Sequence, residues 1–196
     1  IVFVFGGIGS DSMTQTYPNL YRAADLIENG KDLLGFDFAR GYGAVRAISV
    51  INIFDWMILF GTKNLAYLMG ISQILKIILS FVLFYVYLVL INRKEVVCYI
   101  GAASYALCGH MIMRQFWKGY SNEVVLSAFL LIALEYSISK KKRMLLPIAL
   151  LLYCITMGEY NSIYVFGLVI GYTLFRYFEL YDFEFCGLLK LVLYHL

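Results

Sequence analysis

The amino-acid sequence predicts an all-α protein: a polytopic transmembrane helix bundle with a long, partly helical external first loop. Of its 196 residues, 62% are hydrophobic and 15% are charged, whereas soluble globular chains are about 45–50% apolar and about 25% charged. The hydrophobic residues gather in long runs, and short segments rich in Lys and Arg separate some of these runs. This surplus of apolar residues is too large for one small core, so we expect it to face lipid.

The apolar runs predict the individual spans in order along the chain. A helix needs about 20 mostly apolar residues to cross the hydrocarbon core of a bilayer. The run 65–91 is the longest, and the next begins after only four residues. We expect spans at about 65–91, 96–113, 122–138, 144–161 and 162–178, with the boundary between the last two near 158–162.

The basic residues predict the orientation of these spans. Short loops rich in Lys and Arg stay in the cytoplasm, and Arg93, Lys94 and the run 140–143 (KKKR) are separated by two spans. Both basic segments can therefore lie on the inner side. This arrangement puts residues 9–64, the loop 114–121 and the turn around Glu159 on the outer face.

The external loop, 9–64, contains recognisable local structure. Pro18 near the start of the segment 18–29 and Gly30 just after it are typical of the two ends of a helix. Its apolar residues fall on one face and its charged residues on another, so we expect an amphipathic helix lying on the membrane surface. The segment 36–46 is predicted to be an ordered loop rather than a strand. The apolar run 47–60 is too short to span, and we expect it to be re-entrant or interfacial.

Both ends of the sequence indicate that the chain is a fragment of a longer protein. Residues 1–8 (IVFVFGGI) are apolar but too few to cross a bilayer, and they lack an initiator Met. We interpret them as the end of a span. Residues 187–196 (GLLKLVLYHL) form a second incomplete apolar run. We therefore expect any activity to belong to the parent protein.

The strongest local feature is Asp11, which follows the glycine-rich end of the first apolar run on the outer side. Its position alone is equally typical of a solvated acid after a helix end. Several segments in the same order resemble the bacterial YfhO-type membrane proteins. They are Gly9-Ser10-Asp11 with Gln15, Tyr17 and Pro18; 104–111 (SYALCGHM); 131–143 (LIALEYSISKKKR); and, more loosely, 157–164 (MGEYNSIY).

YfhO-type proteins resemble the GT-C superfamily of polytopic glycosyltransferases, and this resemblance implies a function. It implies transfer of a sugar from a polyprenyl-phosphate donor to a cell-envelope glycan such as teichoic acid, on the extracellular side of the bacterial cytoplasmic membrane. The implied catalytic position is the acidic residue of the first external loop, which is Asp11. A carboxylate there can accept the proton that the acceptor hydroxyl loses, and inversion at the anomeric carbon is expected for a single general base.

Several other charged residues are candidates for binding the donor or the acceptor. Arginine binds phosphate well because its planar fork can donate to two oxygens. A second acid close to Asp11 is also possible at the outer ends of the spans. The candidates for phosphate or substrate binding are Arg114, Arg40, Arg46, Glu123, Glu159 and Lys76. Lys118 is better explained as an interfacial anchor, His110 as hydrogen-bonded within the bundle, and Glu135 as an inner-surface charge.

Lys76 supports a second hypothesis because it lies within a predicted span. It is about 16 Å along the helix from Leu65, near mid-bilayer, where a cation costs about 2.5–3.5 kcal/mol. Ser72, Gln73, Lys76 and Ser80 share one helical stripe, which should face the bundle interior. A buried acid could balance Lys76. Alternatively, Lys76 could contact a lipid phosphate or line a transport path.

Three classes of function therefore stay open. The leading one is a membrane glycosyltransferase, the second is a transporter or flippase of lipid-linked sugars, and the third is a non-catalytic accessory subunit. The formal charge of +3 is small and scattered, so nucleic acid is not an expected partner, whereas membrane lipid is. No cofactor is certain, and no metal ligands are assigned; a divalent metal is left open, because one acid without a clear second ligand is too little to support or exclude it. The four cysteines have no CxxC spacing and are interpreted as buried small apolar residues.

Overall fold

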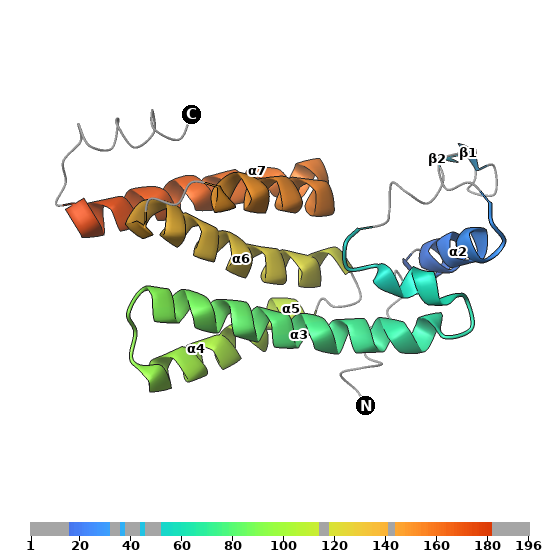
Figure 1. Ribbon diagram of the computed structural model, residues 1–196, viewed down its shortest axis with the longest axis horizontal. Helices are drawn as coiled ribbons and strands as arrows, with labels where there is room; N and C mark the ends of the chain where they lie inside the picture. The colour runs from blue at the N-terminus through green and yellow to red at the C-terminus, as the bar shows by residue number, and fades with distance from the viewer. Residues whose placement is uncertain are drawn as a thin grey trace. The chain divides into compact units, whose positions relative to one another are not determined.

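The computed structural model describes residues 16–31, 36–37, 44–45, 52–113, 118–140 and 144–181 (Figure 1). These residues are almost entirely helical, which confirms the predicted all-α class. The predictions for residues 1–8 and 187–196 lie outside the described residues. The chain divides into two compact units: residues 1–79 with 106–124, and residues 80–105 with 125–196. We describe each unit separately.

The helices follow one another closely along the chain. They are α2 (Tyr17–Glu28), the 3-10 helix η3 (Trp56–Phe60), α3 (Leu65–Leu90), α4 (Glu95–Ala106), α5 (Gly109–Met113), α6 (Lys118–Lys140) and α7 (Leu145–Tyr181). The segment predicted to be a loop, 36–46, contains two strands of two residues each, β1 (Phe36–Asp37) and β2 (Ala44–Val45). They pair antiparallel, with Phe36 opposite Val45 and Asp37 opposite Ala44.

Three segments of the described residues are long and apolar enough to cross a membrane. They are Leu65–Leu90, Glu95–Ile112 and Tyr120–Lys140. Their positions follow the first three predicted spans, because uninterrupted apolar runs of this length have few alternatives to a helix. The second of these segments contains α4 and all of α5 except Met113. Leu145–Met157 is a shorter apolar helical segment.

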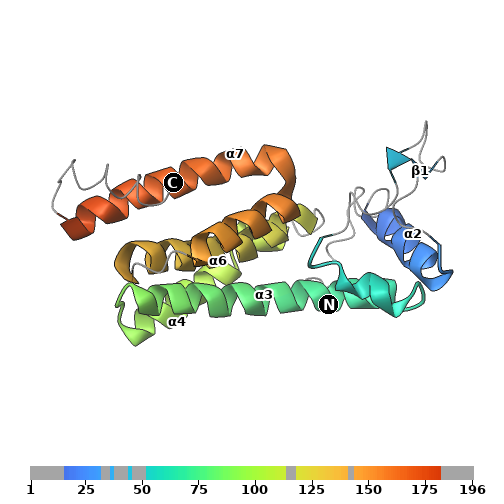
Figure 2. The same ribbon diagram turned by 45° about the horizontal axis from the view of Figure 1, so that its top comes forward.

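The region predicted to hold the last two spans is one helix, α7, of 37 residues. We expected a break at 158–162, but helical structure continues through these residues. Pro147 lies in the first turn, where proline is tolerated, and no proline follows it. A straight helix of this length would be about 55 Å long. Figure 2 shows instead that α7 folds back on itself, so that its two ends lie near each other.

The first unit has a hydrophobic core between α2, η3 and the start of α3. Its buried residues are Leu20, Ala23, Ala24, Leu26, Met57, Ile58 and Leu65. We expected the apolar face of α2 to lie on the membrane surface, and this expectation is corrected: that face packs against protein. Met57 and Ile58 of the 3-10 helix pack against this face, so protein rather than lipid covers its apolar side chains.

The ends of α2 agree with the predicted helix 18–29. Pro18 lies in the first turn. At the other end, Gly30 has a φ of 63°, and the N–H of Lys31 donates to the carbonyl of Leu26 at 2.8 Å. This pattern is a Schellman motif, which requires a left-handed residue and so favours glycine.

The second unit holds α4 alongside the end of α3 through aromatic contacts. The rings of Phe84 and Tyr105 stack with centroids 4.0 Å apart, and those of Tyr85 and Tyr99 lie 4.9 Å apart. Asn92, with a φ of 57°, ends α3 and turns the chain towards α4. This compact aromatic interface explains why only a short polar turn separates the two helices.

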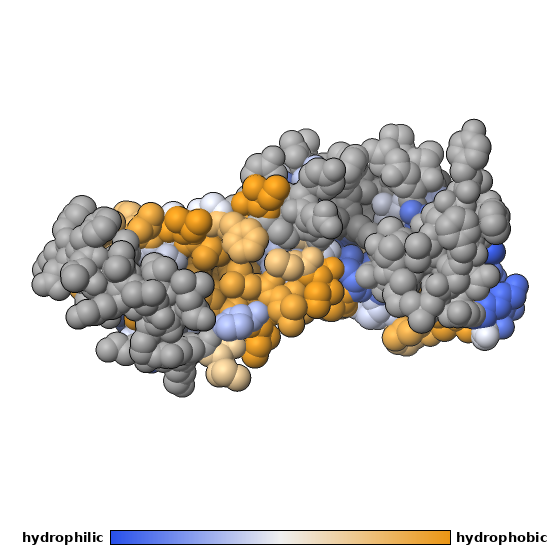
Figure 3. All heavy atoms as spheres, turned by 90° about the horizontal axis from the view of Figure 1, so that it is seen from above, coloured by the Kyte–Doolittle hydropathy of each residue, from blue (hydrophilic) through white to orange (hydrophobic). Residues whose placement is uncertain are grey.

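Much of the apolar surface of the second unit faces outward. Figure 3 looks down on α7 and shows extensive hydrophobic surface on the described part of that face. The outward-facing residues of α7 include Leu151, Ile155, Ile163 and Phe175. Exposed apolar surface on this scale is what a helix bundle in lipid presents.

The packing of α2 predicts the effect of a core substitution. Leu20→Ala should destabilise the docking of α2 by about 2–5 kcal/mol, because it removes buried methyl groups and leaves a cavity. Hydrogen exchange of residues 16–31 in the full-length protein should then accelerate. Tyr21→Ala, at an outward position, is the matched control and should change exchange little. Equal acceleration in both variants would contradict this core.

Glu28 predicts a pH dependence of the same docking. Its carboxylate accepts the backbone N–H of Thr62 at 3.2 Å and the Thr62 hydroxyl at 3.0 Å. These hydrogen bonds, the backbone one first, lower the pKa of Glu28. The contact therefore contributes stability above the ordinary glutamate pKa of about 4.3, and this contribution is lost as the pH falls through the lowered value.

The test compares the wild-type protein with Glu28→Gln. The thermal midpoint of the wild-type protein should be higher at pH 7, and the difference should shrink towards pH 3. Glu95→Gln, another exposed position, is the control. A difference that is the same at both pH values would contradict the role of the Glu28 carboxylate.

Candidate functional site

The structure places some of the predicted site residues and not others. Lys76 and Glu123 are described with their side chains, and Glu159 is described only as part of the α7 backbone. Four predicted residues lie outside the described residues: Asp11, Arg40, Arg46 and Arg114. The roles predicted for these four residues and for the Glu159 side chain therefore stay predictions.

The polar stripe of α3 is buried, as predicted. The exposed fractions of Ser72, Lys76 and Ser80 are 1%, 3% and 0%. Burial of a lysine is costly unless its charge is stabilised. The contacts of Lys76 are therefore the first place to look for a functional site.

Lys76 lies among polar and aromatic groups of the first unit. Its Nζ is 3.3 Å from the hydroxyl of Ser121 and 5.4 Å from the centre of the Phe54 ring. Asp55, the residue after Phe54, is buried, and its carboxylate accepts the N–H of Asn52 at 3.0 Å. Ser72 donates to the carbonyl of Phe54 at 3.3 Å, which ties this turn to α3.

The two neighbouring helices give Lys76 different levels. Ser121 is in the first turn of α6, so Lys76 lies level with the start of that helix. Within α3, about 16 Å of helical rise separates Lys76 from Leu65 and about 21 Å separates it from Leu90. Lys76 is therefore near the middle of its own helix.

Two amide side chains close in sequence to Lys76 or Ser121 carry buried atoms without a hydrogen-bond partner in the described part of the chain. They are Oε1 of Gln73 and both Oδ1 and Nδ2 of Asn122. Asn122 is fully buried. Buried polar atoms normally have partners, and each orphan costs about 1–3 kcal/mol. We refer to Ser72, Gln73, Lys76, Ser121 and Asn122 as the Lys76 cluster.

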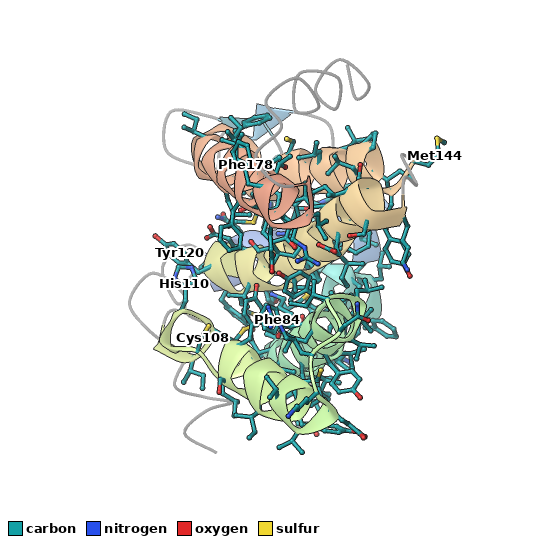
Figure 4. All side chains as sticks on the ribbon, turned by 90° about the vertical axis from the view of Figure 1, so that its left-hand side faces the viewer. Phe84, Cys108, His110, Tyr120, Met144 and Phe178 are labelled. Carbon is teal, nitrogen blue, oxygen red and sulfur yellow. The ribbon has the colours of Figure 1, made fainter. Side chains whose placement is uncertain are left out.

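Glu123 has a different environment from that of Lys76. Its Oε2 is 3.3 Å from Nε2 of His110. Figure 4 shows His110 and Tyr120 side by side, and their rings meet edge to face at 4.9 Å. His110 is thus hydrogen-bonded, as expected.

Glu135 is not the inner-surface charge that we expected. It is 2% exposed, and Arg176 of α7 donates to both of its carboxylate oxygens, with the shortest contact at 3.0 Å. Tyr172 donates to Oε2 at 2.8 Å, and Ser139 donates to Oε1. The fold-back of α7 causes this difference, because it returns Arg176 to the helix that carries Glu135.

This second group of residues, the Glu135 network, extends to a third helix. Tyr87 of α3 donates to the hydroxyl of Tyr172 at 3.2 Å. On the outer edge, Arg176 also contacts Glu179 at 2.6 Å. Every oxygen of the Glu135 carboxylate has a donor, so the network is complete and structural. Sequence reasoning missed it because Arg176 is 41 residues away from Glu135, and local patterns do not report such pairs.

The chemistry of the two groups differs accordingly. The Lys76 cluster combines a cation with unused donors and acceptors, which suits a polar anionic ligand. Within the described residues, no group of three or more His, Cys, Asp or Glu side chains could hold a metal ion.

The cysteines agree only in part with the expected burial. Cys98 is buried, but Cys154 is exposed on the surface of α7. The residues exposed around Cys154 are apolar, and a thiol is compatible with such a surface.

Comparison of this chain with protein-family models, with curated proteins and with solved structures finds no match.

The Glu135 network predicts strongly coupled effects of substitution. Glu135→Leu or Arg176→Met alone should destabilise the protein by about 3–5 kcal/mol, because each leaves a buried charge without its partner. The double variant should cost much less than the sum. Thermal unfolding in one detergent measures all three proteins.

Glu179→Gln is the control, because this residue is exposed and pairs of that kind contribute about 0–1 kcal/mol. Additive effects of the two buried substitutions would contradict the ion pair.

Proposed function

We propose that this chain is part of an integral membrane glycosyltransferase that binds the phosphate of a polyprenyl-phosphate sugar donor at Lys76. The observation that carries the proposal is the burial of Lys76 beside the first turn of α6. An ammonium group held among polar side chains is a common element of phosphate-binding sites. The level of Lys76 with the start of α6 supports a ligand at that end of α6.

The start of α6 supports the same ligand. The first turn of a helix has backbone N–H groups without helical partners, and the helix dipole adds partial positive charge there. Lys76 and the Ser121 hydroxyl lie beside this turn. Phosphate binding at helix starts is common for these reasons.

The proposed reaction uses Asp11 as the general base, on the resemblance to YfhO-type proteins. The acceptor hydroxyl oxygen forms a bond to the anomeric carbon while the bond from that carbon to the phosphate oxygen breaks. The hydroxyl proton passes to the Asp11 carboxylate. Polyprenyl phosphate leaves with the electron pair, and Lys76 stabilises its charge. Arg114, Arg40 and Arg46 are further candidates for this role on the outer side.

The remaining parts of the proposal follow the same resemblance. The protein would lie in the bacterial cytoplasmic membrane with its active side outward, and the acceptor would be a cell-envelope glycan. Glu123 and Glu159 remain candidates for acceptor binding. In the case of Glu123, the pairing with His110 supports a positioned carboxylate.

A flippase for lipid-linked sugars is the second candidate function. The buried polar stripe of α3 favours it, because transporters enclose polar groups within their spans. A transporter is expected to hold its substrate near the bilayer midplane. The level of Lys76 with the start of α6 therefore favours the glycosyltransferase.

Transfer assays on the full-length protein test the proposal. Membranes would receive a radiolabelled polyprenyl-phosphate hexose, and both glycan labelling and donor translocation would be measured. Lys76→Met should lower kcat/KM for transfer by about 10²-fold, the scale seen when one charge-stabilising group is removed. Asp11→Asn should abolish transfer but leave donor binding intact.

Lys63→Met is the matched control, because Lys63 is an exposed lysine of the same unit. It should leave transfer unchanged. Loss of translocation without loss of transfer in Lys76→Met would move the assignment to a flippase. Normal transfer in both Lys76→Met and Asp11→Asn would reject the proposed function.

A further inference from the structure

The last two residues of η3 are large and apolar but lie outside the protein core. Met57 and Ile58 are buried in the core that η3 shares with α2. The next residues, Leu59 and Phe60, are 68% and 61% exposed. Exposed apolar side chains scattered singly are ordinary, whereas adjacent large ones beside a membrane-spanning segment indicate a surface that something covers.

The length of α3 shows at what level of the bilayer this surface lies. Its 26 residues are about 39 Å long, so about 9 Å of the helix extends beyond a hydrocarbon core of about 30 Å. The polar residues Ser72, Gln73 and Lys76 lie in its first half, whereas residues 77–90 are apolar apart from Ser80 and two tyrosines. The surplus length therefore belongs at the start of α3, among the lipid head groups.

The core of the first unit packs against this start of α3. Leu65 belongs to the buried cluster, and Leu68 and Met69 pack against it. These residues fall within about 6 Å of helical rise. Figure 1 shows α2 and the adjoining turn of η3 at this end of α3. The exposed end of η3 is thus at the level of the first turns of α3.

The exposed residues that follow η3 have the chemistry of a membrane interface. Lys63 is exposed, and a lysine beside a span can place its amine among head groups while its methylenes cover apolar surface. Tyr67 is exposed in the first turn of α3, and tyrosine is enriched at membrane–water interfaces. Tyr67 shares one helical face with the exposed residues Ile74 and Ile78, so this surface continues into the apolar surface of the span.

We infer that Leu59 and Phe60 anchor the first unit in the head-group layer of the bilayer that α3 enters. Protein covers the apolar face of α2, so η3 and not α2 supplies the lipid contact outside the spans. The sequence left a re-entrant and an interfacial placement open for residues 47–60, and the level of η3 favours the interfacial one. This inference does not depend on the proposed function.

Tryptophan fluorescence in lipid vesicles tests the inference. The ring of Trp56 meets that of Phe60 edge to face, with centroids 5.8 Å apart, so Trp56 reports the surroundings of the anchor. Trp117 and any further tryptophan of the full-length protein would be replaced by Phe. Lipids brominated near the head group should quench Trp56 several-fold more strongly than lipids brominated near the end of the acyl chain.

Tyr21→Trp in a Trp56→Phe background is the matched control, because Tyr21 is an exposed aromatic residue of α2. A tryptophan there should be quenched little by either lipid. Absence of quenching of Trp56 by both lipids would overturn the inference, and stronger quenching by the deep bromines would replace it with a re-entrant segment. Equal shallow quenching at position 21 would overturn the assignment of the lipid contact to η3.

Hydrogen exchange gives a second readout that needs no change of tryptophan. Leu59→Ser combined with Phe60→Ser removes apolar area that lipid would bury, and both positions lie outside the core. In vesicles, exchange of residues 56–60 should become several-fold faster than in the wild-type protein. Tyr21→Ser should leave this exchange unchanged. Unchanged exchange in the double variant would contradict an anchoring role of Leu59 and Phe60.

Discussion

The ion pair between Glu135 and Arg176 organises the second unit. Removing two charges from water costs several kcal/mol for each ion, and only a good hydrogen-bonding geometry repays this cost. Arg176 meets that requirement by donating to both carboxylate oxygens, while Tyr172 and Ser139 complete the shell. The pair also fixes the path of α7. Along a straight helix, Arg176 would lie about 46 Å from Leu145, so its contact with α6 requires the chain to reverse.

The Lys76 cluster follows the opposite principle. Its cation is buried as deeply as Glu135, but the surrounding amides keep atoms without partners. A protein that needed only stability could replace these amides by apolar residues at little cost. The two groups therefore differ in how completely their buried polar atoms are paired within the described residues. The Glu135 network stabilises the fold, whereas the unpaired amide atoms beside Lys76 add no hydrogen bonds to it.

The sequence predicted the features that depend on local patterns. Pro18 and Gly30 bracket α2 because the backbone rules at helix ends act within a few residues, and the burial of the Lys76 stripe follows from helical spacing. Contacts between distant segments could not be predicted. The sequence near Glu135 does not indicate a contact with Arg176. Asn122 looks like an ordinary polar residue at the start of a helix, and its burial depends on segments that are distant in the sequence. The face of α2 was misassigned for the same reason, since η3 lies 28 residues after Glu28.

The fold-back of α7 brings residue 181 back to the level of Leu145 (Figure 2). A straight helix of 37 residues would place its two ends about 55 Å apart. The reversal lets the second half of α7 pack beside α6, where Arg176 meets Glu135. Two helical segments thus form a hairpin without a loop between them.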